Sequence, residues 1–306
     1  MITKSEINDL RKMPLRELMG LALEKKLANR AQKVSLCSII NAKSGKCSED
    51  CRFCVQSAHY ETDCPVYSLK DRREVLEAAA EAKRIGAGRF SLVTSGRGMN
   101  REQVEPVAEL AAAIRDEVGI KVCASLGILG VEEAGILKEA GVSRYHHNLE
   151  TSREFFPQVV STHSFDERIA TIKACQEVGF EVCAGGIFGL GESEDDRVSM
   201  ALTLRELKVD SIPINVLIPL PGTPFENLAP LPVADILKAI ALFRLINPEV
   251  PIRLAAGREV VFGDSLGMAF MAGADGMMIG GYLTQRGRLP EEDRHFAEEM
   301  QKIWTI

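Results

Sequence analysis

The stretch REQVEPVAELAAAIRDEVGIKVCAS, residues 101–125, shows the repeating pattern that decides the fold. Its first part, Arg101–Glu117, has apolar residues at helical spacing, and the β-like run Ile120–Ser125 follows. Gly119 stands between them, and glycine readily takes the left-handed backbone that ends a helix. The stretch therefore predicts a helix followed by a strand, the repeating unit of an α/β fold.

The same alternation continues along the chain. At a length of 306 residues, eight β-like runs separated by helical patterns predict a single (β/α)8 barrel of the TIM type. A doubly wound open sheet is the alternative, but Gly186, Gly189 and Gly191 do not follow the G-x-G-x-x-G order of a dinucleotide site. The other predicted strands are Val34–Asn41, Arg89–Thr94, Arg144–Asn148, Phe180–Ile187, Ser211–Leu217, Ile252–Ala255 and Gly276–Ile279; the other predicted helices are Arg72–Arg84, Glu132–Ala140, Asp166–Glu177, Glu194–Leu207, Val233–Leu245 and Asp264–Ala272.

Helical patterns flank the barrel at both ends of the chain. Residues 1–32 carry an amphipathic pattern that Pro14 should break in two, so we expect an N-terminal helical extension there. The barrel is expected to cover residues 33–285. The pattern Pro290–Lys302 predicts a C-terminal helical tail over residues 286–306, with no further domain after it.

Composition and charge narrow the classes of function. Hydrophobic residues make up 46% of the chain and charged residues 26%, a balance typical of a soluble globular protein. The net charge of −6 argues against nucleic acid as a partner, because phosphate binding needs a concentrated positive surface. We find no apolar run long enough for a membrane span and no export signal, so a cytoplasmic protein without a membrane partner is expected.

The cysteines suggest a metal centre. In a reducing cytoplasm, clustered cysteines usually bind metal or carry redox chemistry. The segment Cys47-Ser-Glu-Asp-Cys51-Arg-Phe-Cys54 offers three thiolates on a loop after the first strand. A C-x3-C-x2-C set can hold three irons of a cubane cluster and leave the fourth iron open to a substrate. The alternative is a structural zinc site with Cys64 as the fourth ligand.

This cysteine segment resembles that of the radical S-adenosylmethionine (SAM) enzymes. Further segments are similar to the biotin synthase family and its close relatives, which include the radical SAM maturase of [FeFe] hydrogenase and methylornithine synthase. The resemblance spans roughly residues 34–285 and is carried by residues 46–60 (KCSEDCRFCVQSAHY), 145–152 (YHHNLETS), 182–192 (VCAGGIFGLGE), 212–215 (IPIN), 222–224 (GTP) and 253–259 (RLAAGRE).

The resemblance implies roles for particular residues. Cys47, Cys51 and Cys54 would hold a [4Fe–4S] cluster whose open iron binds SAM. Asn148 and Asn215 would contact the substrate, dethiobiotin, and the family usually has Asp at the position of Glu150. His146 and His147 should lie near the substrate, where a histidine more often orients hydrogen bonds than binds metal. For each polar residue the alternative is a structural role. The implied cofactor contacts are Phe53, Thr94, Ser95, Asn148, Glu150, Arg168 and Ile187.

A second set of residues departs from the family. Common members hold a [2Fe–2S] cluster with cysteines on strands two, three and five and an arginine on strand seven. The last three match as Cys123, Cys183 and Arg253, but Ser91 stands on strand two, and serine is a poor ligand for soft metals. Cys37, on strand one, restores the count of three thiolates; its alternative is a small buried hydrophobe.

We therefore expect Cys37, Cys123 and Cys183 to ligate an auxiliary iron–sulfur cluster. The four-iron type is favoured over [2Fe–2S], with Arg253 as a neighbour or weak ligand. Alternate strands of a barrel contribute to one interior layer, so these four residues can face one another.

The activity that the resemblance implies is sulfur insertion into dethiobiotin to form biotin, with the sulfur delivered from the auxiliary cluster. A flavodoxin- or ferredoxin-type electron donor and a homodimer are expected on the same ground. The alternatives are a related radical SAM maturase or mutase with another substrate, and a non-catalytic zinc or electron-transfer protein.

Overall fold

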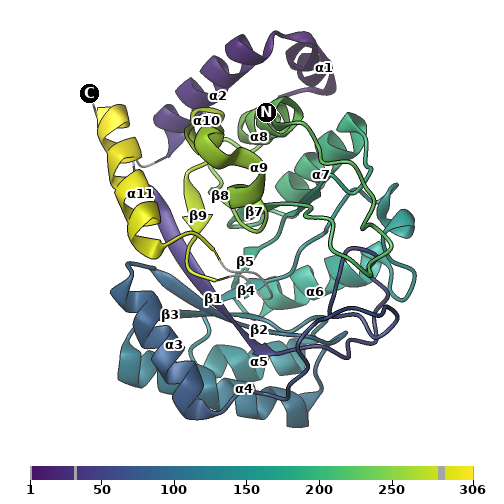
Figure 1. Cartoon of the computed structure of the whole chain (residues 1–306), viewed down its shortest axis with the longest axis vertical. Helices are drawn as coiled ribbons and strands as arrows, with labels where there is room; N and C mark the ends of the chain where they lie inside the picture. The colour runs from purple at the N-terminus through teal and green to yellow at the C-terminus, as the bar shows by residue number, and fades with distance from the viewer. Residues whose placement is uncertain (1, 31–32, 282–286, 306) are drawn as a thin grey trace.

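The computed structural model describes residues 2–30, 33–281 and 287–305. In these residues nine strands, all paired in parallel, form one sheet in the order β5-β4-β3-β2-β1-β9-β8-β7-β6. The sheet curls so that its first and last strands are consecutive in the chain, and helices surround it (Figure 1). The predicted α/β fold of the TIM-barrel type is confirmed. The strands are β1 (Ser35–Lys43), β2 (Arg89–Thr94), β3 (Lys121–Ser125), β4 (Arg144–His146), β5 (Glu181–Cys183), β6 (Gly186–Phe188), β7 (Ile212–Val216), β8 (Ile252–Leu254) and β9 (Gly276–Met278).

The strand predicted over Phe180–Ile187 is divided into two short strands, β5 and β6. The break falls at Gly185, whose backbone passes so close to Pro213 of β7 that a Cβ would lie 1.9 Å from the proline carbonyl oxygen. Pro213 has no N–H to donate to a neighbouring strand. The Gly185 carbonyl accepts from the other side of the segment, from the backbone N–H groups of residues 149 and 150, which follow β4. Isolated bridges join this segment to both of its neighbours, and these are Glu150 with Gly186 and Cys183 with Ser211.

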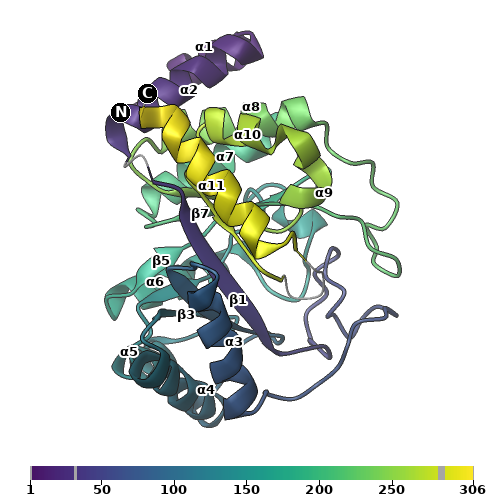
Figure 2. The ribbon, with the colours of Figure 1, turned by 60° about the vertical axis from the view of Figure 1, so that its left-hand side comes forward.

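Helices connect the strands on the outside of the barrel (Figure 2). Several begin where a polar side chain accepts from a backbone N–H three residues later, as at Asp71, Asn100 and Ser164. The helix predicted over Asp264–Ala272 begins later, and α9 before it was missed because it is only five residues long. The connecting helices are α3 (Arg72–Arg84), α4 (Arg101–Ala113) with a π-helical turn at Ile114–Val118, α5 (Val131–Glu139), α6 (Phe165–Glu177), α7 (Glu194–Glu206), α8 (Val233–Ile246), α9 (Arg258–Phe262) and α10 (Leu266–Met271).

The N-terminal segment is helical and breaks at Pro14, as predicted, into α1 (Lys4–Lys12) and α2 (Leu15–Asn29). Helix α2 packs on α8 and α10 (Figure 1). Its Lys26 is buried, donates to the Phe270 carbonyl at 3.1 Å, and lies 3.3 Å from the centre of the Trp304 ring. Burial lowers the pKa of Lys26 to about 7.

We expect the wild-type chain to gain stability relative to Lys26→Met as the pH rises from about 7 towards 10. Lysine in an unfolded chain titrates near 10.4, whereas Lys26 in the folded chain titrates at about 7. Between these values the unfolded chain binds a proton that the folded chain has released, so rising pH favours folding. Denaturant unfolding of both proteins across this range measures the difference in free energy. A difference that is independent of pH would show that folded Lys26 keeps its proton.

The C-terminal segment contains the helix α11 (Pro290–Thr305). The predicted boundaries at residue 32 and at residues 285 and 286 lie outside the described residues, so the division into extension, barrel and tail stays a prediction. Among the described residues no helix has the length and apolar character needed to cross a membrane.

Candidate active site

The cysteine loop follows β1 and is tied to the rest of the barrel by its backbone. The Cys47 N–H donates to the Gln56 carbonyl at 2.9 Å. Gly45 begins the loop with a φ of 76°, and a Cβ there would lie 2.6 Å from Val66 Cγ2. The Ser95 hydroxyl, just after β2, donates to the Gly45 carbonyl at 2.8 Å. The loop is therefore attached to the second strand as well as to the first.

Two carboxylates between the cysteines attach the loop to the segment before α6, a contact that sequence reasoning missed. Glu49 Oε2 lies 2.5 Å from His163 Nδ1 and accepts from Thr162 Oγ1 at 2.7 Å. Asp50 accepts from the backbone N–H groups of Ser161 and Thr162. Burial raises the pKa of Asp50, but hydrogen bonds from these two residues outweigh it and lower the pKa to about 2. The partners lie far along the chain, so the sequence carried no signal for this contact.

The cysteine thiols face the barrel interior. Cys47 and Cys51 line a central cavity, and Cys54 lines the cavity beside it. Burial raises the pKa of Cys51, and it raises the pKa of Cys54 to about 11. Such thiols stay protonated unless positive charge is brought to them, and a bound metal centre would supply that charge.

The spacing of the thiols bears on the zinc alternative. In the described part of the chain, no three His, Cys, Asp or Glu side chains gather closely enough to hold one metal ion. A zinc site needs its ligands around a single centre, whereas a cubane cluster places each thiolate on a separate iron. A single zinc ion would therefore require these side chains to move closer together.

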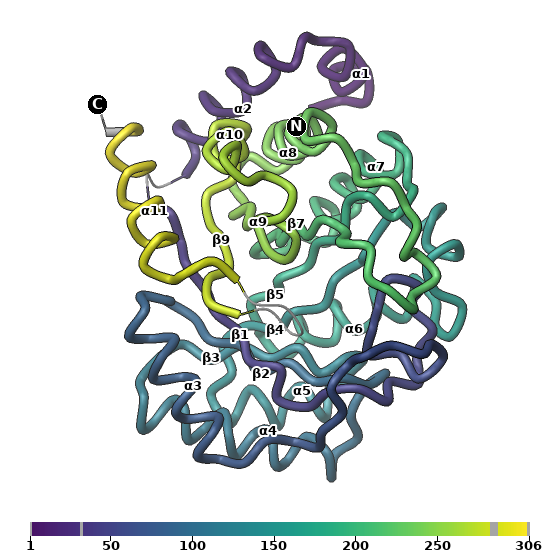
Figure 3. Tube along the Cα trace, viewed as in Figure 1, coloured from purple at the N-terminus to yellow at the C-terminus, as the bar shows by residue number. Residues whose placement is uncertain are grey.

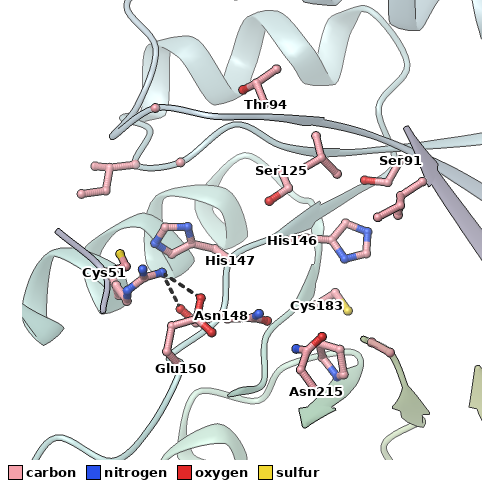
Figure 4. A pocket seen from close by; sticks show the side chains of 18 of the residues that line it. Cys51, Ser91, Thr94, Ser125, His146, His147, Asn148, Glu150, Cys183 and Asn215 are labelled. Atoms are coloured by element: carbon pink, nitrogen blue, oxygen red, sulfur yellow. Dashed lines mark hydrogen bonds and ion pairs between the residues drawn. The ribbon is translucent and has the colours of Figure 1, made fainter. Parts of the chain in front are cut away.

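The central cavity has a volume of about 280 Å³ and lies at the carboxyl ends of the strands. A second cavity of about 370 Å³ adjoins it, and Asn148, Glu150 and Asn215 line both. Figure 4 shows how these side chains from separate elements converge. Of the predicted site residues, those that line one or both cavities are Cys37, Cys47, Cys51, Phe53, Cys54, Thr94, Asn148, Glu150, Arg168, Cys183, Ile187, Asn215 and Arg253.

Glu150 and Arg168 form a buried pair of opposite charge. Arg168 Nη1 donates to the Asn148 carbonyl at 2.9 Å and lies 3.8 Å from Glu150 Oε1. Burial raises the pKa of Glu150, while Arg168 and a hydrogen bond with Asn148 act in the opposite direction. The backbone of Glu150 has a φ of 68°, in the left-handed region that residues other than glycine seldom adopt. Backbone strain of this kind concentrates at functional sites.

Several buried polar atoms around the central cavity have no hydrogen-bond partner among the residues that the structure describes. Buried polar groups are normally paired, so a group of unpaired ones at a cavity points to a bound ligand. The set includes both a carboxylate oxygen and a guanidinium nitrogen, which suit the ammonium and the carboxylate of an amino acid. The unpaired atoms are Ser91 Oγ, Thr94 Oγ1, His146 Nε2, His147 Nε2, Glu150 Oε2, Arg168 Nε and Arg253 Nη1.

The other three predicted cysteine ligands come together deeper in the barrel. Cys37 on β1 and Cys183 on β5 line the central cavity, and Cys37 and Cys123 line a small hollow next to it with Arg253 of β8. Burial raises the pKa of Cys123 to about 11 against the opposing charges of Arg89 and Arg144, and the nearby thiols of Cys37 and Cys183 contribute to the rise. Ser91 of β2 pairs in register with Cys123. The structure thus brings together residues from alternate strands, as barrel geometry predicts.

Three arginines surround these thiols. Arg89 and Arg144 both donate to Glu181, at 2.8 and 2.6 Å, and Arg253 Nε donates to Ser211 Oγ at 3.1 Å. Their charges lower the pKa values of the buried thiols, against the larger effect of burial, and so favour thiolates. Sequence reasoning missed Arg89 and Arg144, because an arginine in a strand gives no signal until the register shows which face it occupies.

Two consecutive histidines reach the central cavity from the end of β4. His146 lines both the central cavity and the small hollow, whereas His147 lines the central cavity alone. Burial lowers the pKa of His146 to about 3, and Arg144 and Arg253 contribute. Burial also lowers the pKa of His147, with a contribution from Arg168. Both imidazoles are therefore neutral near pH 7.

Comparison with known proteins assigns the family. Residues 42–204 match the radical SAM superfamily, and residues 213–301 match the Biotin and Thiamin Synthesis associated domain. The biotin synthase of Heliobacterium modesticaldum is 54% identical over 88% of this chain and 83% of its own length. That of Acetivibrio thermocellus is 47% identical over 98% of this chain and 94% of its own length. The chain belongs to the biotin synthase family.

Membership in the biotin synthase family confirms the resemblance, and the radical SAM superfamily implies a [4Fe–4S] cluster and SAM. Solved structures agree in fold. A methylornithine synthase aligns with a TM-score of 0.83 at 19% identity, covering 98% of this chain and 93% of its own. The FeFe-hydrogenase maturase of Carboxydothermus hydrogenoformans aligns with a TM-score of 0.81 at 17% identity, covering 97% of this chain and 74% of its own. At these identities the likeness concerns the fold alone.

In this member of the biotin synthase family, two of the predicted contacts are partly used by the protein itself. Asn215 Nδ2 donates to the Gly186 carbonyl at 3.2 Å, and its Oδ1 accepts from the Ala256 N–H at 3.1 Å. Its amide keeps one N–H and one lone pair for a ligand. Ser95 lines neither cavity, and its hydroxyl takes the structural role at Gly45 described above.

The two cysteines without a predicted role lie elsewhere. The Cys64 sulfur is 3.7 Å from Ser44 Oγ, beside the cysteine loop. Cys175 is buried within α6, as a packing residue would be.

Proposed function

We propose that this chain converts dethiobiotin to biotin by inserting sulfur between two unactivated carbons. One observation supports this most directly: Cys47 and Cys51 line the same cavity as Cys37 and Cys183. A source of radicals at the first pair and a source of sulfur at the second would both reach a substrate held between them. Family membership supports the same substrates, dethiobiotin and SAM.

When bound, the cluster and SAM supply the carbon radical that removes hydrogen from unactivated carbons, chemistry that side chains alone do not perform. The protein binds and orients SAM and the substrate, and it shields the reacting atoms from water. Cys47, Cys51 and Cys54 would hold the cluster, Glu150 would accept from the SAM ammonium, and Arg168 would donate to its carboxylate. The thirteen lining residues named above would also keep water from the reacting atoms. Ile187, Phe53 and Thr94 would complete the cofactor contacts.

The auxiliary site is best explained by a four-iron cluster on Cys37, Cys123 and Cys183. Three thiolates satisfy three irons of a cubane and leave one open, whereas a [2Fe–2S] cluster needs four ligands. Arg253 is a neighbour in this proposal, because its Nε is engaged by Ser211 and its Nη1 is unpaired at the cavity. The open iron would carry the sulfur that enters the product.

Partners and location complete the proposal. An electron donor of the flavodoxin or ferredoxin type and a homodimer are proposed from the family resemblance. The cysteines of the described chain are all free thiols, which suits a reducing compartment such as the cytoplasm. Size-exclusion chromatography tests the homodimer, and cell fractionation tests the cytoplasmic location.

The deciding experiment is an anaerobic assay with dethiobiotin, SAM and a reductant, followed by mass detection of biotin. Biotin formation is expected. Release of 5′-deoxyadenosine without biotin would favour a maturase or mutase with another substrate. Zinc in place of iron and sulfide in the anaerobically purified protein would contradict the enzyme assignment.

Asn215→Ala is expected to weaken dethiobiotin binding by about 1–3 kcal/mol, because a buried ureido group would lose an amide partner. Iron content should be unchanged, and calorimetric titration measures the affinity. The matched control is Asn247→Ala, since Asn247 Nδ2 also donates to a backbone carbonyl, at 3.2 Å to Ala201, while Asn247 lines neither cavity. Both variants should lose stability, but only Asn215→Ala should lose affinity. Equal affinity in the two variants would remove Asn215 from the substrate site.

A further inference from the structure

His146 stands at the boundary between the auxiliary cysteines and the central cavity. It pairs in register with Cys183 across β4 and β5, and it lines both the cavity and the small hollow that contains Cys37 and Cys123. Other residues also line both the central cavity and the small hollow, among them Ser91, Cys37 and Arg253. A group at this boundary faces the auxiliary cysteines on one side and the substrate space on the other.

The imidazole of His146 has a nitrogen available for a ligand. Its Nε2 is buried and has no hydrogen-bond partner within residues 2–30, 33–281 and 287–305. Figure 4 shows the rings of His146 and His147 on opposite sides of the chain, His146 towards Ser91 and Cys183, and His147 towards Cys51. The two adjacent histidines therefore serve different parts of the site.

We propose that His146 is a positioning residue for the transferable sulfur, and that its Nε2–H donates a hydrogen bond to sulfide bound at the open iron of the auxiliary cluster. The inference rests on the proposed function, which supplies that cluster. Sulfide or hydrosulfide on iron is anionic and accepts hydrogen bonds, and an imidazole that carries a proton on Nε2 is a suitable donor. Binding adds one ligand to the iron and requires no oxidant or reductant.

The position of His146 gives this hydrogen bond a direction. Arg89 and Arg144 also line the small hollow, but they do not line the central cavity, and both are engaged by Glu181. His146 also lines the central cavity, so a sulfur held by its Nε2 would face the substrate rather than the barrel floor. The residue would thus select which position on the cluster holds the sulfur.

The test is a titration of the anaerobic holoenzyme, with both clusters assembled from ⁵⁷Fe, against hydrosulfide. Mössbauer spectra follow the auxiliary cluster and give its affinity for the anion. His146→Leu removes the donor and should weaken hydrosulfide binding about tenfold or more, with the iron content retained. His146→Gln places an amide N–H at a similar reach and should restore most of the affinity. His147→Gln is the matched control and should bind hydrosulfide as the wild type does.

The outcomes separate this inference from the function on which it rests. Wild-type affinity in His146→Leu, or equal losses in His146→Leu and His147→Gln, would overturn the role of His146. Loss of the auxiliary iron from His146→Leu would also overturn it, because a residue that contacts only the sulfide is not needed to hold the cluster. If the wild type lacks an auxiliary cluster or makes no biotin, the proposed function itself fails. A wild type that makes biotin, together with unchanged binding in His146→Leu, refutes the histidine alone.

Discussion

Replacing Cys47, Cys51 or Cys54 with alanine is expected to abolish reductive cleavage of SAM. The three thiols face adjoining cavities, and each would bind a separate iron, so no spare ligand compensates for the loss of one. The measurement is 5′-deoxyadenosine released per enzyme under anaerobic conditions with a strong reductant. The fall should reach the background of the assay.

Cys175→Ala is the control for this series. Cys175 is buried in α6 and lines neither cavity, so its replacement removes a cysteine without removing a proposed ligand. SAM cleavage should continue at a rate close to that of the wild type. Normal release of 5′-deoxyadenosine by the variant that lacks all three loop cysteines would disprove the radical SAM site.

Cys37→Ala is expected to stop biotin formation while some SAM cleavage continues. Cys37 would be one of only three thiolates at the auxiliary site, and the cysteine loop holds its own cluster independently. Iron and sulfide content should fall to about that of a single cubane cluster. Parallel assays of biotin and of 5′-deoxyadenosine distinguish this outcome from general unfolding, which would remove both.

Ser91→Ala is the matched control at the same site. Ser91 pairs in register with Cys123 and is also buried, but we propose no metal bond to its oxygen. Its replacement should therefore have a far milder effect on cluster content. Full cluster retention in Cys37→Ala would refute the ligand assignment, and a dominant ferric [2Fe–2S] doublet in the Mössbauer spectrum would refute the four-iron type.

The fold was predictable because its signals are local. Arg72–Arg84 and Arg89–Thr94 were predicted with the bounds that the structure has, since capping residues, glycines and hydrophobic period mark each element within a few positions. The division of strand five was not predictable. It results from the approach of Gly185 to Pro213, which lie on different strands, and no local pattern records that contact.

The site was predictable where spacing or family resemblance identifies a residue. The cysteine loop follows from its spacing, and Asn148, Glu150 and Arg168 follow from the resemblance. The supporting contacts did not follow, because each joins distant parts of the chain. Glu49 contacts His163, and two of the three arginines around the auxiliary thiols, Arg89 and Arg144, share Glu181. These contacts depend on how strands pair and on where loops meet, and a single sequence does not show either.

The left-handed backbone of Glu150 lowers the stability of the fold at a position where the side chain has a proposed function. A residue other than glycine pays roughly 1–2 kcal/mol to adopt that conformation, and here the cost accompanies a carboxylate that lies beside Arg168. Glycine would relieve the strain and remove the carboxylate at the same time. A laboratory-evolution screen for heat resistance alone should therefore accumulate glycine at this position and lose catalysis, whereas a screen that also demands biotin should keep the acid and find its thermal gains elsewhere.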